Sequence, residues 1–362
     1  MYTLGNILRK SLSFLIVPVV TRFMPASEYG VYALLMALNA WLTEIYHLGL
    51  GTAVTRIYFD FRDQELRKRY LGSIWAFVTT FTFVLSLLLT LAGRPVFARV
   101  LRDIPFWPHV LLVIWATFFG MFGLLPYVVL RIREETWKFV LIVVGNALGS
   151  GGLSILFVVV FRLQALGMVL AVFVTTVVFM GIFGFLLRGM ISLKLRGYPV
   201  LEWLRSSLVY GIPIVLLELG WVVLESSDRF LLQHYLSLET VGLYSLGYAL
   251  SKVINYVTDS VELAWAPFFY RTAAEQSAEA PGIFAYAASY YCGLLIVLGL
   301  AVVLFRHQFV AVMAPPEYWG AVQVTPVIVL ASVFRGLYTV SYTHLRAHET
   351  RHDLVCRLLL EK

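Results

Sequence analysis

Charged residues are scarce in this 362-residue chain. They make up 14% of it, against 60% hydrophobic residues and a mean hydropathy of +0.82. So little polar surface cannot coat a water-soluble globule, and lipid must cover the remainder. The formal net charge of +7 does not indicate nucleic-acid binding, because Lys and Arg lie in short loops between apolar runs and form no continuous basic face.

Cysteine is nearly absent as well. Cys292 and Cys356 are the two cysteines, which excludes a disulfide framework. No P-loop pattern occurs, so the chain offers no support for an ATP-driven mechanism, and no cofactor is predicted.

Long apolar runs are abundant. A helix needs roughly 20 apolar residues to cross a hydrocarbon core of ~30 Å, and the chain contains ten runs of about that length. We therefore predict an all-α integral membrane protein of about ten transmembrane helices. The predicted spans are residues 4–23, 31–51, 70–91, 109–130, 137–161, 166–187, 208–224, 241–265, 283–305 and 321–340.

Basic residues predict the topology. Loops rich in Lys and Arg mark the cytoplasmic side, and here the basic loops alternate with loops that carry fewer basic residues. The N-terminus and the polar connector between the sixth and seventh spans are therefore predicted to be cytoplasmic. The first span is read as a membrane helix, because no A-x-A-like site follows it to indicate a cleaved signal peptide.

The span grouping predicts the domain organisation. Residues 1–187 would form an N-terminal lobe of six helices, 188–207 a cytoplasmic connector, and 208–341 a C-terminal lobe of four helices. Residues 342–362 break with this pattern. Their sequence resembles a translated sequencing adapter, so we predict that the natural chain was cut near Ser341 and that this tail is not native.

The tail contains an H-E-x-x-H match formed by His348, Glu349 and His352. In zinc proteases, two such histidines bind the metal and the glutamate acts as the general base. The chain ends ten residues later, leaving no room for a further ligand or a catalytic domain. A metal site is therefore rejected.

Ionisable side chains inside membrane spans are costly and are functional candidates by default. Span eight carries Lys252, Asn255, Asp259 and Glu262, whose spacing places them on one helix face. An open alternative is that these groups neutralise one another along the helix. Two other spans also carry such groups: Glu44 in span two, and Glu218, Glu225, Asp228 and Arg229 in or just beyond span seven.

Several motifs together resemble the Wzx-type polysaccharide flippases. P-V-V-T-R at 18–22 is followed by E-Y-G at 28–30, just before the second span. Further matches, in order, are G-L-G-T-A-V-T-R at 49–56, G-I-P at 211–213, D-R-F at 228–230, V-G-L-Y-S at 241–245 and W-A-P-F at 265–268.

The resemblance implies a MATE-like fold of the MOP exporter superfamily, with twelve or more helices in two six-helix lobes around a cavity. About ten of these helices are present, so the C-terminal lobe of four helices is expected to be incomplete. It also implies transport of undecaprenyl-pyrophosphate-linked oligosaccharide across the bacterial cytoplasmic (inner) membrane by alternating access. Membrane lipids, glycosyltransferases and a polymerase would be its partners. The candidate substrate-binding residues are Lys10, Arg22, Arg56, Lys252, Asn255 and Arg335, and the candidate coupling or gating residues, for protons or sodium, are Glu44, Glu218, Glu225, Asp228 and Arg229.

Alternatives remain open from the sequence. Arg22 and Arg229 are equally well explained as interfacial anchors at the ends of loops. A MATE drug exporter or a MurJ-type lipid II flippase would share the architecture. A membrane polymerase or ligase of the same pathway would need a large periplasmic loop with catalytic residues, whereas the outer loops here are short.

Overall fold

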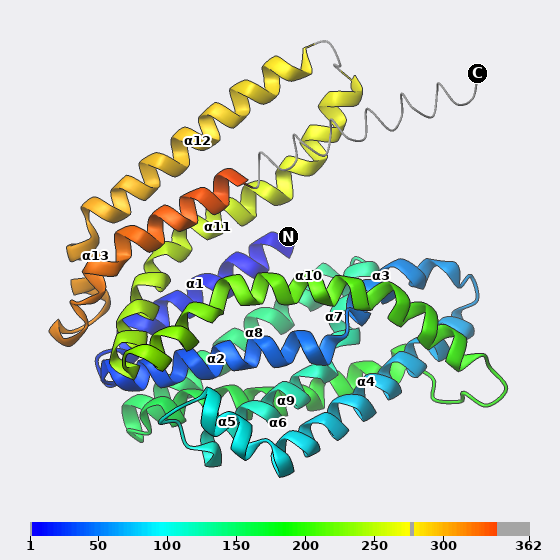
Figure 1. The fold of residues 1–362 in the computed structure, drawn as a ribbon. Helices are drawn as coiled ribbons and strands as arrows, with labels where there is room; N and C mark the ends of the chain where they lie inside the picture. Colours follow the sequence, from blue (N-terminus) through cyan, green and yellow to red (C-terminus); the bar gives the residue numbers. More distant parts are fainter. Residues whose placement is uncertain (1, 276–278, 339–362) are drawn as a thin grey trace. The chain divides into compact units, whose positions relative to one another are not determined.

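The computed structural model describes residues 2–275 and 279–338. All regular structure in these ranges is helical (Figure 1). The predicted tail, the cut near Ser341 and the rejected metal motif lie outside the described residues. The helices are α1 Tyr2–Val20, α2 Ala26–His47, α3 Leu50–Ile57, α4 Gln64–Ala92, α5 Arg94–Val100, α6 Leu111–Gly120, α7 Leu124–Ile132, α8 Thr136–Ile155, α9 Gln164–Met190, α10 Val200–Tyr235, α11 Leu238–Glu275, α12 Ala280–Leu304, α13 Arg306–Met313 and a last helix, Ala321–Tyr338.

Every predicted span coincides with one of these helices or with a run of them. Within the described residues, seven helices are long and apolar enough to cross a membrane, judged by length and composition. The other three predicted spans coincide with α1, α2 and α11. The seven are Gln64–Ala92, Phe106–Ile132, Thr136–Val160, Gln164–Met190, Val200–Tyr235, Ala280–Leu304 and Ala321–Tyr338.

The helices group into two compact units, Met1–Gly242 and Leu243–Lys362. The first unit therefore includes α10, which packs against α2, α3 and α4. The predicted lobe boundaries at 187 and 208 follow the chain's charge and hydropathy, whereas the units follow packing. The lobe division stays a prediction.

The core of the first unit is apolar, with a few internally paired polar groups. Leu34, Leu35 and Ile74 are fully buried. The hydroxyls of Tyr46 and Ser86 lie 2.7 Å apart, which pairs both groups without water. Such pairing lets polar side chains remain inside a bundle that lipid surrounds.

The segment between α9 and α10 is bonded to α4. Helices continue on both sides of it and leave residues 191–199 non-helical. The Ser192 amide donates to the Lys68 carbonyl at 2.9 Å. Arg69 donates to the Lys194 carbonyl at 2.8 Å and lies over the Tyr198 ring at 4.2 Å. These contacts hold the connector against the start of α4.

Helices α2 and α10 lie side by side in the first unit (Figure 1). In the C-terminal part of each helix, the Trp41 indole N–H donates to the Ser226 hydroxyl at 2.8 Å. Beyond the end of α2, a Cβ added to Gly49 would lie 2.2 Å from the Gly211 carbonyl oxygen, and Gly49 also has a φ of +64°. Only glycine fits this backbone-to-backbone contact.

The second unit contains a polar cluster where three helices meet. The Tyr291 hydroxyl on α12 donates to the Gly336 carbonyl at 3.2 Å. A Cβ on Gly336 would lie 2.9 Å from the Thr258 hydroxyl oxygen of α11. Because Gly336 has no side chain, the last helix packs closely against α11, beside the polar stripe of α11.

Candidate functional site

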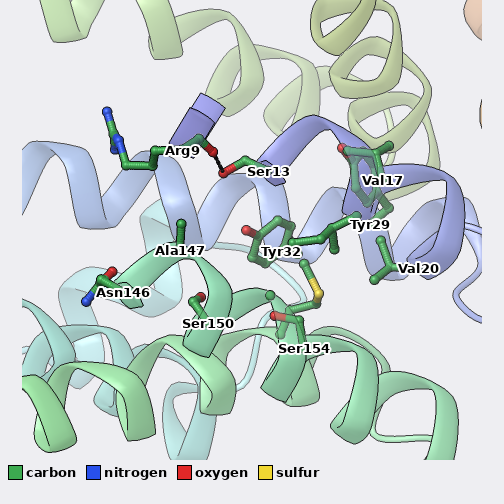
Figure 2. Close-up of a pocket in the computed structure, with 13 residues that line it drawn as sticks. Arg9, Ser13, Val17, Val20, Tyr29, Tyr32, Asn146, Ala147, Ser150 and Ser154 are labelled. Atoms are coloured by element: carbon green, nitrogen blue, oxygen red, sulfur yellow. Dashed lines mark hydrogen bonds between the residues drawn. The ribbon is translucent and has the colours of Figure 1, made fainter. Parts of the chain in front are cut away.

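A pocket of about 180 Å³ lies in the first unit. Its walls come from α1, α2 and α8, with one residue from α9 (Figure 2). The lining residues are Arg9, Ser13, Ile16, Val17, Val20, Tyr29, Tyr32, Asn146, Ala147, Ser150, Gly151, Ser154 and Met168.

The α1 wall carries the pocket's positive charge. Arg9 lies one helical turn before Ser13, whose hydroxyl donates to the Arg9 carbonyl at 3.0 Å. No carboxylate of the described residues lies within ion-pair distance of the Arg9 guanidinium, and the lining contains no Asp or Glu. Arg9 and Asn146 lie toward one end of the pocket, and Val20 and Ser154 toward the other (Figure 2).

The α8 wall is a stripe of hydrogen-bonding groups. Asn146, Ser150 and Ser154 are four residues apart, so one face of the helix carries all three. Within the described residues, none of these side chains forms a hydrogen bond to protein. Their donors and acceptors are available to water or to a ligand.

The stripe meets α1 because Gly151 leaves room for it. A Cβ added to Gly151 would lie 2.4 Å from Ile16 Cδ1. Gly151 therefore permits close packing of α8 against α1.

Two tyrosines from α2 lie between these walls (Figure 2). Tyr29 is 7% exposed, and its ring centroid lies 6.2 Å from that of Tyr32. Their rings give the pocket a flat apolar surface beside its hydroxyl and amide groups.

The E-Y-G motif positions this part of the pocket. Glu28 accepts a hydrogen bond from the Ala165 amide at 3.2 Å, which attaches α2 to the positive N-terminal end of α9. Tyr29 enters the pocket. A Cβ added to Gly30 would lie 2.0 Å from the Leu238 carbonyl oxygen, so this residue forms a second backbone contact, with the start of α11.

A model of the family described as polysaccharide biosynthesis protein matches residues 1–273 of the 362. The chain belongs to this family. The match includes every residue that lines the pocket. No curated protein matches the chain significantly.

The fold is that of MATE transporters of the MOP superfamily. An inward-facing multidrug resistance MATE transporter of that superfamily superposes with a TM-score of 0.70 at 14% identity, over 92% of this chain and 82% of that one. A MATE protein in complex with Br-NRF superposes with a TM-score of 0.54 at 15% identity, over 93% of this chain and 84% of that one. The Vibrio cholerae MATE transporter VcmN in its bent form gives 0.52 at 15% identity, over 95% and 85%.

These matches confirm the predicted fold class, an all-α multi-pass membrane protein with a MATE-like bundle.

The basic candidates of the first unit lie outside the pocket lining. Lys10 is half-buried on α1, next to Arg9. Arg22 is exposed just beyond α1. Arg56 is exposed on α3 and pairs with Asp60 at 3.3 Å, one turn along the chain.

The candidates of the second unit lie on or beside the α11 stripe. Lys252 is exposed and Asn255 is 8% exposed, with no hydrogen-bond partner for its Oδ1 atom. Arg335 lies 4.0 Å from Asp259. Because this carboxylate offsets the guanidinium charge, Arg335 is less available to an anionic substrate than an arginine without a carboxylate partner.

The acidic candidates separate into two groups. Glu44 on α2 is half-buried, and Glu218 on α10 lies close enough for the two carboxylates to repel each other. Glu225 is exposed, and its carbonyl accepts from Arg229 at 2.7 Å. Asp228 accepts from the Arg229 amide at 2.8 Å and lies 4.0 Å from its guanidinium. Glu44 and Glu218 face each other from different helices. Glu225 and Asp228 instead bond to Arg229 within α10.

None of the site residues predicted from the sequence lines this pocket. The prediction includes Lys10 but not its neighbour Arg9, and it includes no residue of the α8 stripe. The available signal was the four-residue spacing of Asn146, Ser150 and Ser154 on a span otherwise rich in apolar residues.

Proposed function

We propose that this protein moves a polyprenyl-diphosphate-linked oligosaccharide across the bacterial cytoplasmic membrane as a Wzx-type flippase. The observation that carries the proposal is the family match over residues 1–273, in a chain with the fold of MATE transporters. A membrane protein of a polysaccharide pathway with a transporter fold fits the step in which a lipid-linked glycan changes leaflet.

The chemistry of the site supports this substrate. A diphosphate-sugar head group cannot enter hydrocarbon without hydrogen-bond partners and compensating positive charge, whereas its polyprenyl tail can stay in lipid. The first unit offers Arg9 and a row of amide and hydroxyl groups that no described protein group uses, on helices α1 and α8. Charge-assisted hydrogen bonds from a guanidinium suit phosphate oxygens.

The proposed mechanism is alternating access between two lobes, residues 1–187 and 208–341, with the connector 188–207 and the N-terminus on the cytoplasmic side. Helices α2 and α10 belong to different lobes in this scheme, so their contacts must change during the cycle. Glu44 and Glu218 lie in that contact. They are the proposed coupling residues for a proton or sodium gradient.

The direct test uses the purified protein in liposomes with a fluorescent polyprenyl-diphosphate oligosaccharide. We expect the protein to move the label between leaflets, measured by quenching with an impermeant reductant. The same polyprenol without the sugar-diphosphate is the control for nonspecific scrambling. Transport of amphipathic drugs without transport of the glycolipid would favour a MATE exporter and refute the proposal.

A cellular test separates the flippase from an enzyme of the same pathway. We expect expression of the protein to restore surface polysaccharide in a strain that lacks its flippase. Restoration in a strain lacking the polymerase or ligase, and not in the flippase mutant, would show the enzyme alternative to be correct. The proposed partners, glycosyltransferases and a polymerase, would be encoded beside this gene.

A further inference from the structure

The size of the α1–α2–α8 pocket limits what it can hold. Its volume of about 180 Å³ corresponds to roughly six water molecules at ~30 Å³ each. Pockets for drug-sized ligands span about 300–1,000 Å³. The pocket can therefore enclose one ring-sized group, and the rest of an oligosaccharide would lie outside it.

The lining specifies the chemistry of that group. Asn146, Ser150 and Ser154 present donors and acceptors that no described protein group uses. Tyr29 and Tyr32 add flat aromatic surface against which C–H groups can pack. A saturated ring bearing several hydroxyls matches both features, because it has polar edges and apolar faces.

The charge of the lining adds a second requirement. Arg9 is exposed at the outer end of the pocket, where its guanidinium extends outward, and the lining contains no carboxylate to balance its charge (Figure 2). A guanidinium in this setting is stabilised by an anion. The ring must therefore carry, or be bonded to, a negative group at the Arg9 end.

We propose that this pocket binds a single sugar ring, with the adjoining negative group at Arg9 and the ring hydroxyls at Ser150 and Ser154. The inference rests on the proposed function and names the part of its substrate that the first unit holds. A phosphoryl group bonded to the sugar or the carboxylate of an acidic sugar could each supply the negative group.

Cysteine protection in the full chain tests this site. Cys292 and Cys356 are first replaced by Ser, and Ser150→Cys then puts one thiol in the pocket. Leu148→Cys is the matched control, because Leu148 lies on the same helix, is 55% exposed and does not line the pocket. The rate of reaction with N-ethylmaleimide is measured in detergent with and without glucose 1-phosphate.

We expect glucose 1-phosphate to slow the reaction of the Ser150→Cys thiol about tenfold at ten times its dissociation constant and to leave Leu148→Cys unaffected. Equal rates with and without the sugar would overturn the proposal. Equal protection by inorganic phosphate alone would also overturn it, because the ring would then contribute nothing.

Other probes identify the source of the charge. Stronger protection by glucose 1-phosphate than by glucuronic acid would indicate a phosphoryl group, and the reverse order an acidic sugar. Either result supports the site. When Arg9→Gln is added to Ser150→Cys, we expect the protection given by both charged probes to fall to the protection given by neutral glucose. If Arg9→Gln remains monodisperse and still prefers the charged probes, the role of Arg9 is refuted.

The proposal and the proposed function can fail separately. Protection of Ser150→Cys in a protein that moves no glycolipid would leave the sugar site standing and remove the flippase assignment. Glycolipid transport that is unchanged in Ser150→Ala/Ser154→Ala, without sugar protection of Ser150→Cys, would keep the flippase and remove the site.

Discussion

At the scale of single residues, the E-Y-G motif shows how three consecutive side chains take three different roles. Glu28 bonds to the α9 amide of Ala165, Tyr29 lines the pocket, and Gly30 contacts the backbone at Leu238. Consecutive helical residues point about 100° apart, so one turn of α2 can contact α9, the pocket and α11 separately. This three-residue motif therefore connects α2 to α9, to the pocket and to the start of α11.

The bond from Glu28 to α9 gives a stability prediction. Glu28→Ala removes a carboxylate from a helix N-terminus and leaves the Ala165 amide without its acceptor, which should cost about 1–3 kcal/mol. Glu28→Gln keeps an acceptor oxygen and should cost less, about 0.3–1 kcal/mol. Thermal denaturation in detergent measures both, with the exposed Glu239→Ala as control. Equal stability of Glu28→Ala and the control would contradict the bond.

At the scale of helices, the first unit depends on places where two backbones touch. Gly30 meets the Leu238 carbonyl at the start of α11, and Gly49 meets the backbone of Gly211 on α10. At a third crossing, Gly151 leaves room for the Ile16 side chain of α1. In a membrane, packing between helices is driven by close van der Waals contact, because lipid tails compete equally for apolar side chains. Small residues at these crossings therefore stabilise the bundle more than larger apolar ones would.

Alanine scanning of glycines tests this view. Gly30→Ala and Gly242→Ala should reduce folded protein in the membrane, because each added Cβ would lie 2.0 Å or less from a backbone oxygen. A Cβ added to Gly220 would have no neighbour within 4 Å, so Gly220→Ala should be neutral, or should stabilise the protein by up to ~1 kcal/mol through helix propensity. Fluorescence size-exclusion profiles of tagged variants give the readout. Normal profiles for all three variants would mean that the contacts are not needed.

At the scale of the whole molecule, the more polar helices carry several of the residues proposed to take part in transport. The predicted spans that coincide with α1, α2 and α11 carry Arg9, Glu44 and Asn255, whereas the seven most apolar helices are the clearest membrane spans. Polar side chains inside membrane spans usually face a water-filled cavity or form a functional site. The proposed transport path accordingly combines these more polar helices with the polar faces of α8 and α10.

Coupling of the whole cycle to an ion gradient gives a further prediction. Glu44→Gln removes a charge from the α2–α10 contact, so we expect glycolipid movement in liposomes to lose its stimulation by an imposed proton or sodium gradient. Comparing the two ions identifies which is used. Glu202→Gln, an exposed change on α10, should keep the stimulation. A gradient response that survives in Glu44→Gln would exclude this carboxylate from coupling.

Much of the fold could be predicted because lipid imposes simple local rules. Apolar runs of sufficient length must be helices in hydrocarbon, so every predicted span coincides with helical structure. The helix ends were less predictable. Helix α4 begins at Gln64, because the Asp63 side chain accepts hydrogen bonds from the Glu65 and Leu66 amides, in a polar segment that lies before the predicted span.

By itself, the sequence determined the helices, their approximate spans and the motifs that place the chain in its family. Tertiary structure decided which polar residues meet. Arg9 and Lys10 are equally polar neighbours, and packing of α1 on α8 through Gly151 puts Arg9 in the pocket lining and leaves Lys10 outside it. Hydropathy and spacing act within one helix, whereas a pocket depends on which faces of distant helices come together, and that depends on close packing between residues far apart in the chain.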